Sequence, residues 1–311
     1  MEFIEKSCRW CGEEKYDVVV KGPDLLTGLP GSFQFVKCNN CGLLRQNPYL
    51  NWKYLMKYYP DDYSSYQPQV PDVTSKQRQF DKRYGLWKRV KLVSKYKPTG
   101  KWIDVGAGTG RVLQEAMRWE TWDLMGIEPV ERAAEYIKIK TGLQVFGDRL
   151  EKFSGYENTF DIVTMWDVLE HFEDPIMAIN KVREILRENG IYVFSIPNIK
   201  SWDLRVFKNY WVGYDLPRHL HLFSDVFLST IMKKKGFKII EKKCIAGSHG
   251  ALMLDLLFLS RASKKSKLLE VVTSINPDAY IPRALTFIPL WIFDKLKMGT
   301  NITCVTQKIT K

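Results

Sequence analysis

Four cysteines near the start of the chain form two C-x-x-C pairs, "CRWCG" and "CNNCG". These are Cys8, Cys11, Cys38 and Cys41. This spacing lets both thiolates of a pair bind the same metal ion, and the glycine after the second cysteine permits the turn. Four thiolates form a closed tetrahedral site, which is typical of structural zinc, with iron as the alternative. Residues 1–50 are therefore predicted to be a zinc-ribbon module, whereas Cys244 and Cys304 are expected in the core.

A second group with chemical potential is the glycine-rich turn "WIDVGAGTG", residues 102–110. It departs from the dinucleotide fingerprint, because Arg111 stands where the third glycine belongs. It also lacks the lysine of a phosphate-binding loop. Asp104 before the turn would repel a pyrophosphate and favour a cation. These features favour a cationic ligand without phosphate, and S-adenosylmethionine fits them.

The residues around this turn suit the parts of that ligand. Glycines let the backbone approach it, and the next helix offers free N–H groups to its carboxylate. Glu128 ends the following strand, where an acid can accept hydrogen bonds from both ribose hydroxyls. Asp148 ends the third strand, where it can meet the adenine amino group.

From residue 101 the sequence alternates between strand and helix patterns. Strands are predicted at 101–106, 123–129, 143–148, 160–166, 190–198, 237–247 and 301–311, and helices at 110–119, 130–142, 174–189 and 224–236. This alternation predicts a mostly parallel sheet with helices on both faces.

The chain is accordingly divided into three parts. The zinc-ribbon module, 1–50, is followed by a connector and amphipathic helix, 51–98, in which 76–97 has helical spacing. Residues 99–311 form the predicted catalytic domain, with a helical insertion at about 248–300.

The motifs "IDVGAGTG", "GIEP", "FGD" and "FDIVTMWDVLEHFEDPIMAINKVREILRENGIYVFSIPN" resemble those of class I S-adenosylmethionine-dependent methyltransferases. The resemblance covers about 100–240 and the final strand. It implies a Rossmann-like seven-stranded sheet whose last strand is antiparallel. The expected cofactor-binding residues are Asp104, Gly106, Ala107, Gly108, Gly110, Glu128, Pro129, Asp148, Met165, Trp166 and Asp167.

The stretch "WDVLEHFEDP" resembles the small-molecule branch of this family. Methyl transfer is a direct displacement in which the enzyme aligns the acceptor and often removes a proton, a task that suits histidine. His219, in "GYDLPRHLHLFS", and His171 are therefore the candidate catalytic residues, with a packing role as the alternative. The methylated atom, carbon, nitrogen or oxygen, is left open by these motifs.

The zinc-ribbon module fused to this domain also resembles sugar C-methyltransferases, in which connector tyrosines approach the active site. The weaker substrate-binding candidates are Tyr59, Tyr63, Tyr66, Tyr214 and His221. The expected acceptor is a small molecule or a glycan, with sugars and lipid-linked sugars included.

The net charge of +12 leaves two other functions open. One is an RNA methyltransferase that uses the ribbon and the basic surface, although the ribbon has few basic residues between its cysteine pairs. The other is a non-catalytic S-adenosylmethionine-binding interaction protein. The apolar insertion with basic flanks packs on the sheet edge or attaches peripherally to an anionic membrane. With no signal peptide or spanning segment visible, a cytoplasmic location is expected, the inner face of the membrane included.

Overall fold

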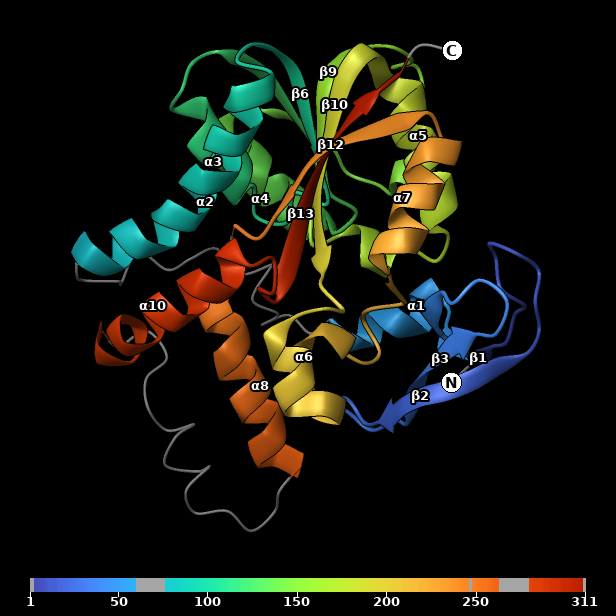
Figure 1. Cartoon of the computed structure of the whole chain (residues 1–311). Helices are drawn as coiled ribbons and strands as arrows, with labels where there is room; N and C mark the ends of the chain where they lie inside the picture. Colours follow the sequence, from blue (N-terminus) through green and yellow to red (C-terminus); the bar gives the residue numbers. More distant parts are fainter. Residues whose placement is uncertain (1–2, 60–75, 246–247, 263–279, 310–311) are drawn as a thin grey trace.

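The computed structural model describes residues 3–59, 76–245, 248–262 and 280–309 (Figure 1). Its centre is a seven-stranded sheet in the order β12-β13-β10-β9-β6-β7-β8. The strands are β6 (Gly100–Val105), β7 (Trp122–Ile127), β8 (Gln144–Phe146), β9 (Phe160–Trp166), β10 (Leu186–Pro197), β12 (Phe237–Lys243) and β13 (Asn301–Lys308). Strands β6 to β10 pair in parallel, and β13 is antiparallel to both of its neighbours. The predicted fold is confirmed.

Helices cover both faces of this sheet because its buried strands carry apolar side chains on both faces. In β6, Trp102 faces one helical layer and Ile103 the other. The first layer consists of α2 (Lys76–Tyr96), α3 (Arg111–Met117) and α4 (Glu131–Thr141). The second consists of α5 (Pro175–Ile185) and α7 (Asp225–Lys234), on the opposite side in Figure 1.

Helix α5 ends four residues earlier than its sequence predicts. It begins where the side chain of Asp174 accepts hydrogen bonds from the N–H groups of Ile176 and Met177. It ends at Ile185, because Leu186 already pairs with Phe160 of β9 as the first residue of β10. The prediction of a helix over 174–189 was wrong at this end, since strand pairing overrides the local helical preference.

The N-terminal module is a small antiparallel sheet beside the catalytic domain. Strands β2 (Tyr16–Gly22), β3 (Phe33–Cys38) and β4 (Leu44–Gln46) pair in sequence order. The fourth strand, β11 (His221–Leu222), comes from the segment after β10 and pairs with β4. The other strands of the module are β1 (Phe3–Ile4) and β5 (Tyr49–Leu50), and the first elements of the connector, α1 (Trp52–Leu55) and the 3-10 turn η1 (Met56–Tyr58), pack on the module. The catalytic segment therefore completes the sheet of the module.

The predicted insertion is helical where the structure describes it. Helices α8 (Ser248–Ala262) and α10 (Tyr280–Lys295) contact each other, and α8 also packs on α6 (Trp202–Phe207). The exposed side of α10 carries large apolar residues, such as Phe287 and Trp291. Within the described ranges, no helix is long and apolar enough to cross a membrane.

Arg218 joins the N-terminal module to the catalytic domain. Its fully buried guanidinium donates to Asp24, in the loop after β2, at 2.7 and 3.1 Å, and to Asp215 at 2.6 to 3.1 Å. It also donates to the carbonyl oxygen of Tyr58 at 3.1 Å. Burial alone would raise the pKa of Asp215, but the charge and hydrogen bonds of Arg218, together with the nearby His219 and His171, outweigh it, and that pKa is lowered.

We expect Arg218→Met to lower the free energy of unfolding by about 3–5 kcal/mol, because two buried carboxylates lose their cation. Urea denaturation followed by tryptophan fluorescence measures this change. The matched control is Arg187→Met, which removes a partly exposed pair with Asp161 and should cost less than about 1 kcal/mol. Equal effects of the two substitutions would contradict the importance given to the buried cluster.

Candidate functional site

A cavity of about 410 Å³ lies where β6, β7 and β9 end, the edge at which parallel sheets bind ligands. The sheet side of its wall consists of Val105, Gly106, Gly108, Ile127, Glu128, Pro129, Trp166 and Asp167. The remaining wall comes from Trp52, Tyr59, Arg89, Arg149, Leu150, Glu151, Val168, His171, Phe172, Glu173 and His219. The start of the connector, the helix α2 and the catalytic domain thus all contribute to one cavity.

The glycine turn has two different tasks. Gly106 and Gly108 line the cavity, and a Cβ on Gly106 would lie 2.7 Å from the Val168 side chain. Gly110, with φ +70°, lies outside the wall, and a Cβ there would lie 2.9 Å from Ile137 of α4. Two glycines therefore open the cavity, and the third allows close packing between α3 and α4. Ala107 is also outside the wall and packs among the side chains of the α2–α3–α4 layer.

Glu128 is the buried acid of the cavity wall. Its carboxylate accepts hydrogen bonds from the N–H groups of Gly108, at 2.7 Å, and Val130, at 2.9 Å. Burial raises its pKa to about 7. The two backbone N–H groups fix the carboxylate at the end of β7, where its free lone pairs can accept from a ligand.

Besides Ala107 and Gly110, three more of the expected cofactor residues are not on this wall. Asp104 is buried beneath it, where its carboxylate accepts from the Thr164 hydroxyl and burial raises its pKa to about 7. Met165 is also buried and accepts from the Tyr192 hydroxyl at 3.1 Å. Asp148 is 39% exposed and pairs with Lys152 at 2.8 Å. Asp104 and Met165 therefore support the wall from behind, whereas Asp148 lies at the surface.

Arg89 of α2 is a wall residue that the sequence analysis missed. Its guanidinium donates to Asp167 at 3.2 Å and lies 5.0 Å from the centre of the Trp166 ring. A signal was present, since Arg89 lies three residues after Leu86 and four before Val93, on the apolar stripe of the helix.

The two candidate catalytic histidines lie together in the cavity wall, and their ring centres are 4.7 Å apart. Nδ1 of His171 lies 2.9 Å from the carbonyl oxygen of Arg218 and 2.9 Å from the Tyr59 hydroxyl. Nδ1 of His219 lies 2.8 Å from the carbonyl oxygen of Gly213. Because a carbonyl can only accept, both Nδ1 atoms carry a proton, and in the neutral form of each ring Nε2 carries a lone pair. Burial lowers the pKa of His171 to about 3, which keeps it neutral.

The weaker substrate candidates have different surroundings. Tyr59 is on the cavity wall, but Tyr214 packs in the core of the N-terminal module, 5.6 Å from the Phe35 ring. His221 belongs to β11, where its Nδ1 donates to the Phe172 carbonyl at 3.1 Å, and it lies outside the wall. It does not share the cavity with His219. Tyr63 and Tyr66 lie outside the described residues.

Gln46 of β4 fixes the backbone on both sides of Arg218. Its side-chain amide donates to the carbonyl oxygens of Pro217, at 2.9 Å, and His219, at 2.5 Å. Its backbone N–H donates to the carbonyl oxygen of Leu220 at 2.9 Å. The N-terminal module therefore positions the segment that carries His219.

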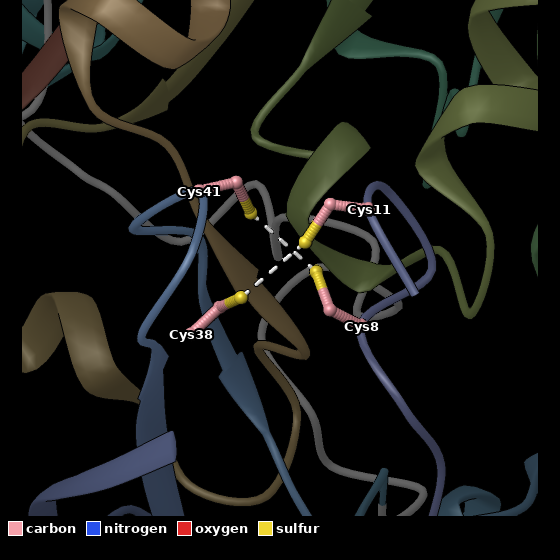
Figure 2. A group of neighbouring side chains, drawn as sticks. All are labelled: Cys8, Cys11, Cys38 and Cys41. Carbon is pink, nitrogen blue, oxygen red and sulfur yellow. Dashed lines mark hydrogen bonds between the residues drawn. The ribbon is translucent and has the colours of Figure 1, made fainter. Parts of the chain in front are cut away.

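The four cysteines of the two pairs converge on one point (Figure 2). The Sγ atoms of Cys8 and Cys41 are 3.5 Å apart, as are those of Cys11 and Cys38. Thiolates around one zinc ion, each at about 2.3 Å, would be about 3.8 Å apart. Both pairs have the same turn, in which the N–H of Gly12 or Gly42 donates to the carbonyl of the first cysteine. The arrangement fits a tetrahedral ion.

Most residues of the cavity wall lie in a part of the chain that matches one protein family. Residues 77–242 match the family model described as "Methyltransferase domain". The ubiquinone biosynthesis O-methyltransferase of Histophilus somni is 33% identical over 52% of this chain and 73% of that protein. The protein of the same name from Pasteurella multocida is 30% identical over 40% of this chain and 58% of its own length, less than two thirds.

A candidate methyltransferase of known structure from Bacillus halodurans has a similar fold. The TM-score is 0.50, with 15% identity over 71% of this chain and 98% of that chain. At this identity the likeness concerns the fold alone.

We expect Glu128→Gln to weaken the binding of S-adenosylhomocysteine at least about tenfold at pH 8, because a charged acceptor is lost. The wild-type affinity should rise from pH 6 to pH 8, since the carboxylate forms as the pH passes its raised pKa of about 7. The dependence should be weaker in the variant. Isothermal titration calorimetry measures both, with exposed Glu131→Gln as the control. An affinity of the Glu128 variant within about twofold of wild type would rule out this role.

Proposed function

The chain belongs to the class I S-adenosylmethionine-dependent methyltransferases, and from this premise we propose that it methylates a hydroxyl oxygen of a small aromatic molecule. The observation that carries the proposal is the pairing of His171 and His219 in the wall of the cofactor cavity. Their Nε2 lone pairs offer two sites for a hydroxyl proton. The names of the matched relatives also include O-methyltransferase activity.

The sheet side of the cavity is the proposed cofactor half. When bound there, S-adenosylmethionine supplies an electrophilic methyl group on a sulfonium. Glu128 would accept hydrogen bonds from the ribose hydroxyls of the ligand. Gly106 and Gly108, which have no side chain, would let the ligand approach the protein backbone. Arg89, adjacent to Trp166, would meet the carboxylate of the ligand, since Arg recognises carboxylates through paired donors.

The opposite side is the proposed acceptor half. Trp52, Tyr59 and Phe172 give it aromatic walls, and Arg149 lies 5.2 Å from the Trp52 ring centre. Such a surface favours a flat aromatic acceptor with a polar substituent. His219 is the primary candidate to receive or orient the hydroxyl proton, with His171 beside it, and the Arg218 carbonyl and Tyr59 hydroxyl hold His171 in place.

The N-terminal module is proposed to hold one structural zinc ion on Cys8, Cys11, Cys38 and Cys41. The convergence of the four thiols and their spacing support this ion. In this proposal, zinc stabilises the module, and the module holds the backbone around His219 through Gln46. Zinc acts at a distance and does not contact the acceptor.

We expect production of S-adenosylhomocysteine with a catechol acceptor, and no production with a nucleotide sugar or a structured RNA. His219→Ala should lower kcat at least about 100-fold, because proton removal is lost, and leave cofactor affinity unchanged. His249→Ala, outside the cavity wall, is the control. Turnover only with the RNA or the sugar would overturn the aromatic acceptor. Near-normal turnover of the His219 variant would overturn the histidine role.

Mass spectrometry of the purified chain should find one zinc ion per molecule. Cys38→Ser should lose it and lower the midpoint of thermal unfolding, because the remaining three thiolates leave the site open. Cys244→Ala removes a cysteine outside the cluster and should retain the zinc. Folded wild-type protein without zinc would refute the proposed ion.

A further inference from the structure

Glu170 is a buried acid that directly precedes His171 of the acceptor half and is not itself part of the cavity wall. It lies in the 3-10 turn η3 (Leu169–His171), and its side chain is fully buried. Among the described residues, neither of its carboxylate oxygens has a hydrogen-bond partner. A buried carboxylate in this state is costly, so such groups are normally paired or bind a cation.

The two histidines of the cavity form a cluster with Glu170. Oε1 of Glu170 lies 4.0 Å from Nε2 of His219, beyond hydrogen-bond distance. One ligand atom from each of Glu170, His171 and His219 lies within 4.8 Å of the others. Ligands about 2.1 Å from an ion lie about 3.0–3.4 Å apart, so small side-chain rotations would bring the three onto one centre.

The tautomers of both histidines suit metal binding. Each Nδ1 donates to a backbone carbonyl, that of Arg218 for His171 and that of Gly213 for His219. This is the arrangement by which proteins hold metal-binding imidazoles, because it directs the Nε2 lone pair to the ion. Two imidazoles and one carboxylate form a donor set for divalent first-row metals, with positions left for substrate.

The surrounding charges also favour a cation. The nearest cations are already matched, since Arg218 pairs with Asp24 and Asp215, and Arg89 with Asp167. A divalent ion would therefore supply a positive charge and a bonding partner to the carboxylate of Glu170.

We propose that Glu170, His171 and His219 bind a divalent first-row metal ion that holds the acceptor hydroxyl. This inference rests on the proposed function and refines it, because the histidines then act through the ion. Coordination lowers the pKa of the hydroxyl, and its proton leaves to water. The oxygen forms the new O–CH₃ bond as the S–CH₃ bond breaks, and the sulfonium becomes the neutral thioether of S-adenosylhomocysteine.

The experiment titrates MnCl₂ into the full, zinc-loaded chain and follows free Mn²⁺ by electron paramagnetic resonance. Mn²⁺ prefers nitrogen and oxygen ligands, so the cysteine site does not compete. The wild type should bind one Mn²⁺ per chain. Glu170→Gln and His219→Ala should each bind it at least about tenfold more weakly, as expected for loss of one ligand.

Glu173→Gln is the matched control, because Glu173 is a carboxylate of the same wall outside the cluster. It should bind Mn²⁺ as the wild type does, and unchanged affinity for S-adenosylhomocysteine shows that each variant is folded. Absence of Mn²⁺ binding by the wild type, or wild-type binding by both ligand variants, overturns the site.

The metal proposal and the proposed function can fail separately. Protein treated with a chelator that spares its zinc, and freed of other divalent ions, should lose catechol methylation and regain it with MnCl₂. Full activity without added metal overturns the ion's role and leaves the methyltransferase proposal intact. Mn²⁺ binding at Glu170 without methylation of any acceptor overturns the proposed function and leaves the metal site intact.

Discussion

One buried guanidinium connects the two parts of this protein. Arg218 neutralises Asp24 of the N-terminal module and Asp215 of the catalytic domain, and it is fully buried. The carbonyl of the same residue orients His171, and the next residue is His219. The charge pairing that holds the parts together therefore also fixes the position and tautomer of His171 and the backbone position of His219. The acceptor half of the cavity depends on this one residue being fully paired.

The residues that define the fold are predictable because their signals are local. Strand and helix patterns alternate along the chain, glycines follow β6, and the cysteine pairs have the spacing of a metal knuckle. Each of these signals comes from a few adjacent residues. The end of α5 could not be predicted, because Leu186 pairs with Phe160 of β9, which is remote in sequence.

The cavity was harder to predict than the fold for the same reason. Trp166 and His219 were found through motifs. No motif marks Arg89, which lies in a basic helix, or Gln46, which lies in a short strand. Their roles arise from contacts with residues 78 and more than 170 positions away. Asp148 shows the opposite case, because it stands at the expected strand end but its side chain turns to Lys152. A motif gives the position of a backbone, and packing decides where the side chain points.

The family match has a boundary that divides the cavity. It covers residues 77–242, which include the glycine turn, Glu128 and both histidines. Asp24, Gln46, Trp52 and Tyr59 come before it and contribute to the acceptor half or hold it. The similarity to known methyltransferases therefore informs the donor half most directly, and the chemistry of the acceptor is better inferred from the N-terminal module.

The pairing of β11 with β4 has a consequence for synthesis of the chain. Residues 3–59 leave the ribosome before the strand that completes their sheet, His221–Leu222, which follows more than 160 residues later. The edge of β4 stays unpaired through that interval, and open strand edges are prone to pair with other chains. The nascent protein thus carries an exposed edge until the segment bearing His219 emerges, and that event closes the sheet and completes the cavity together.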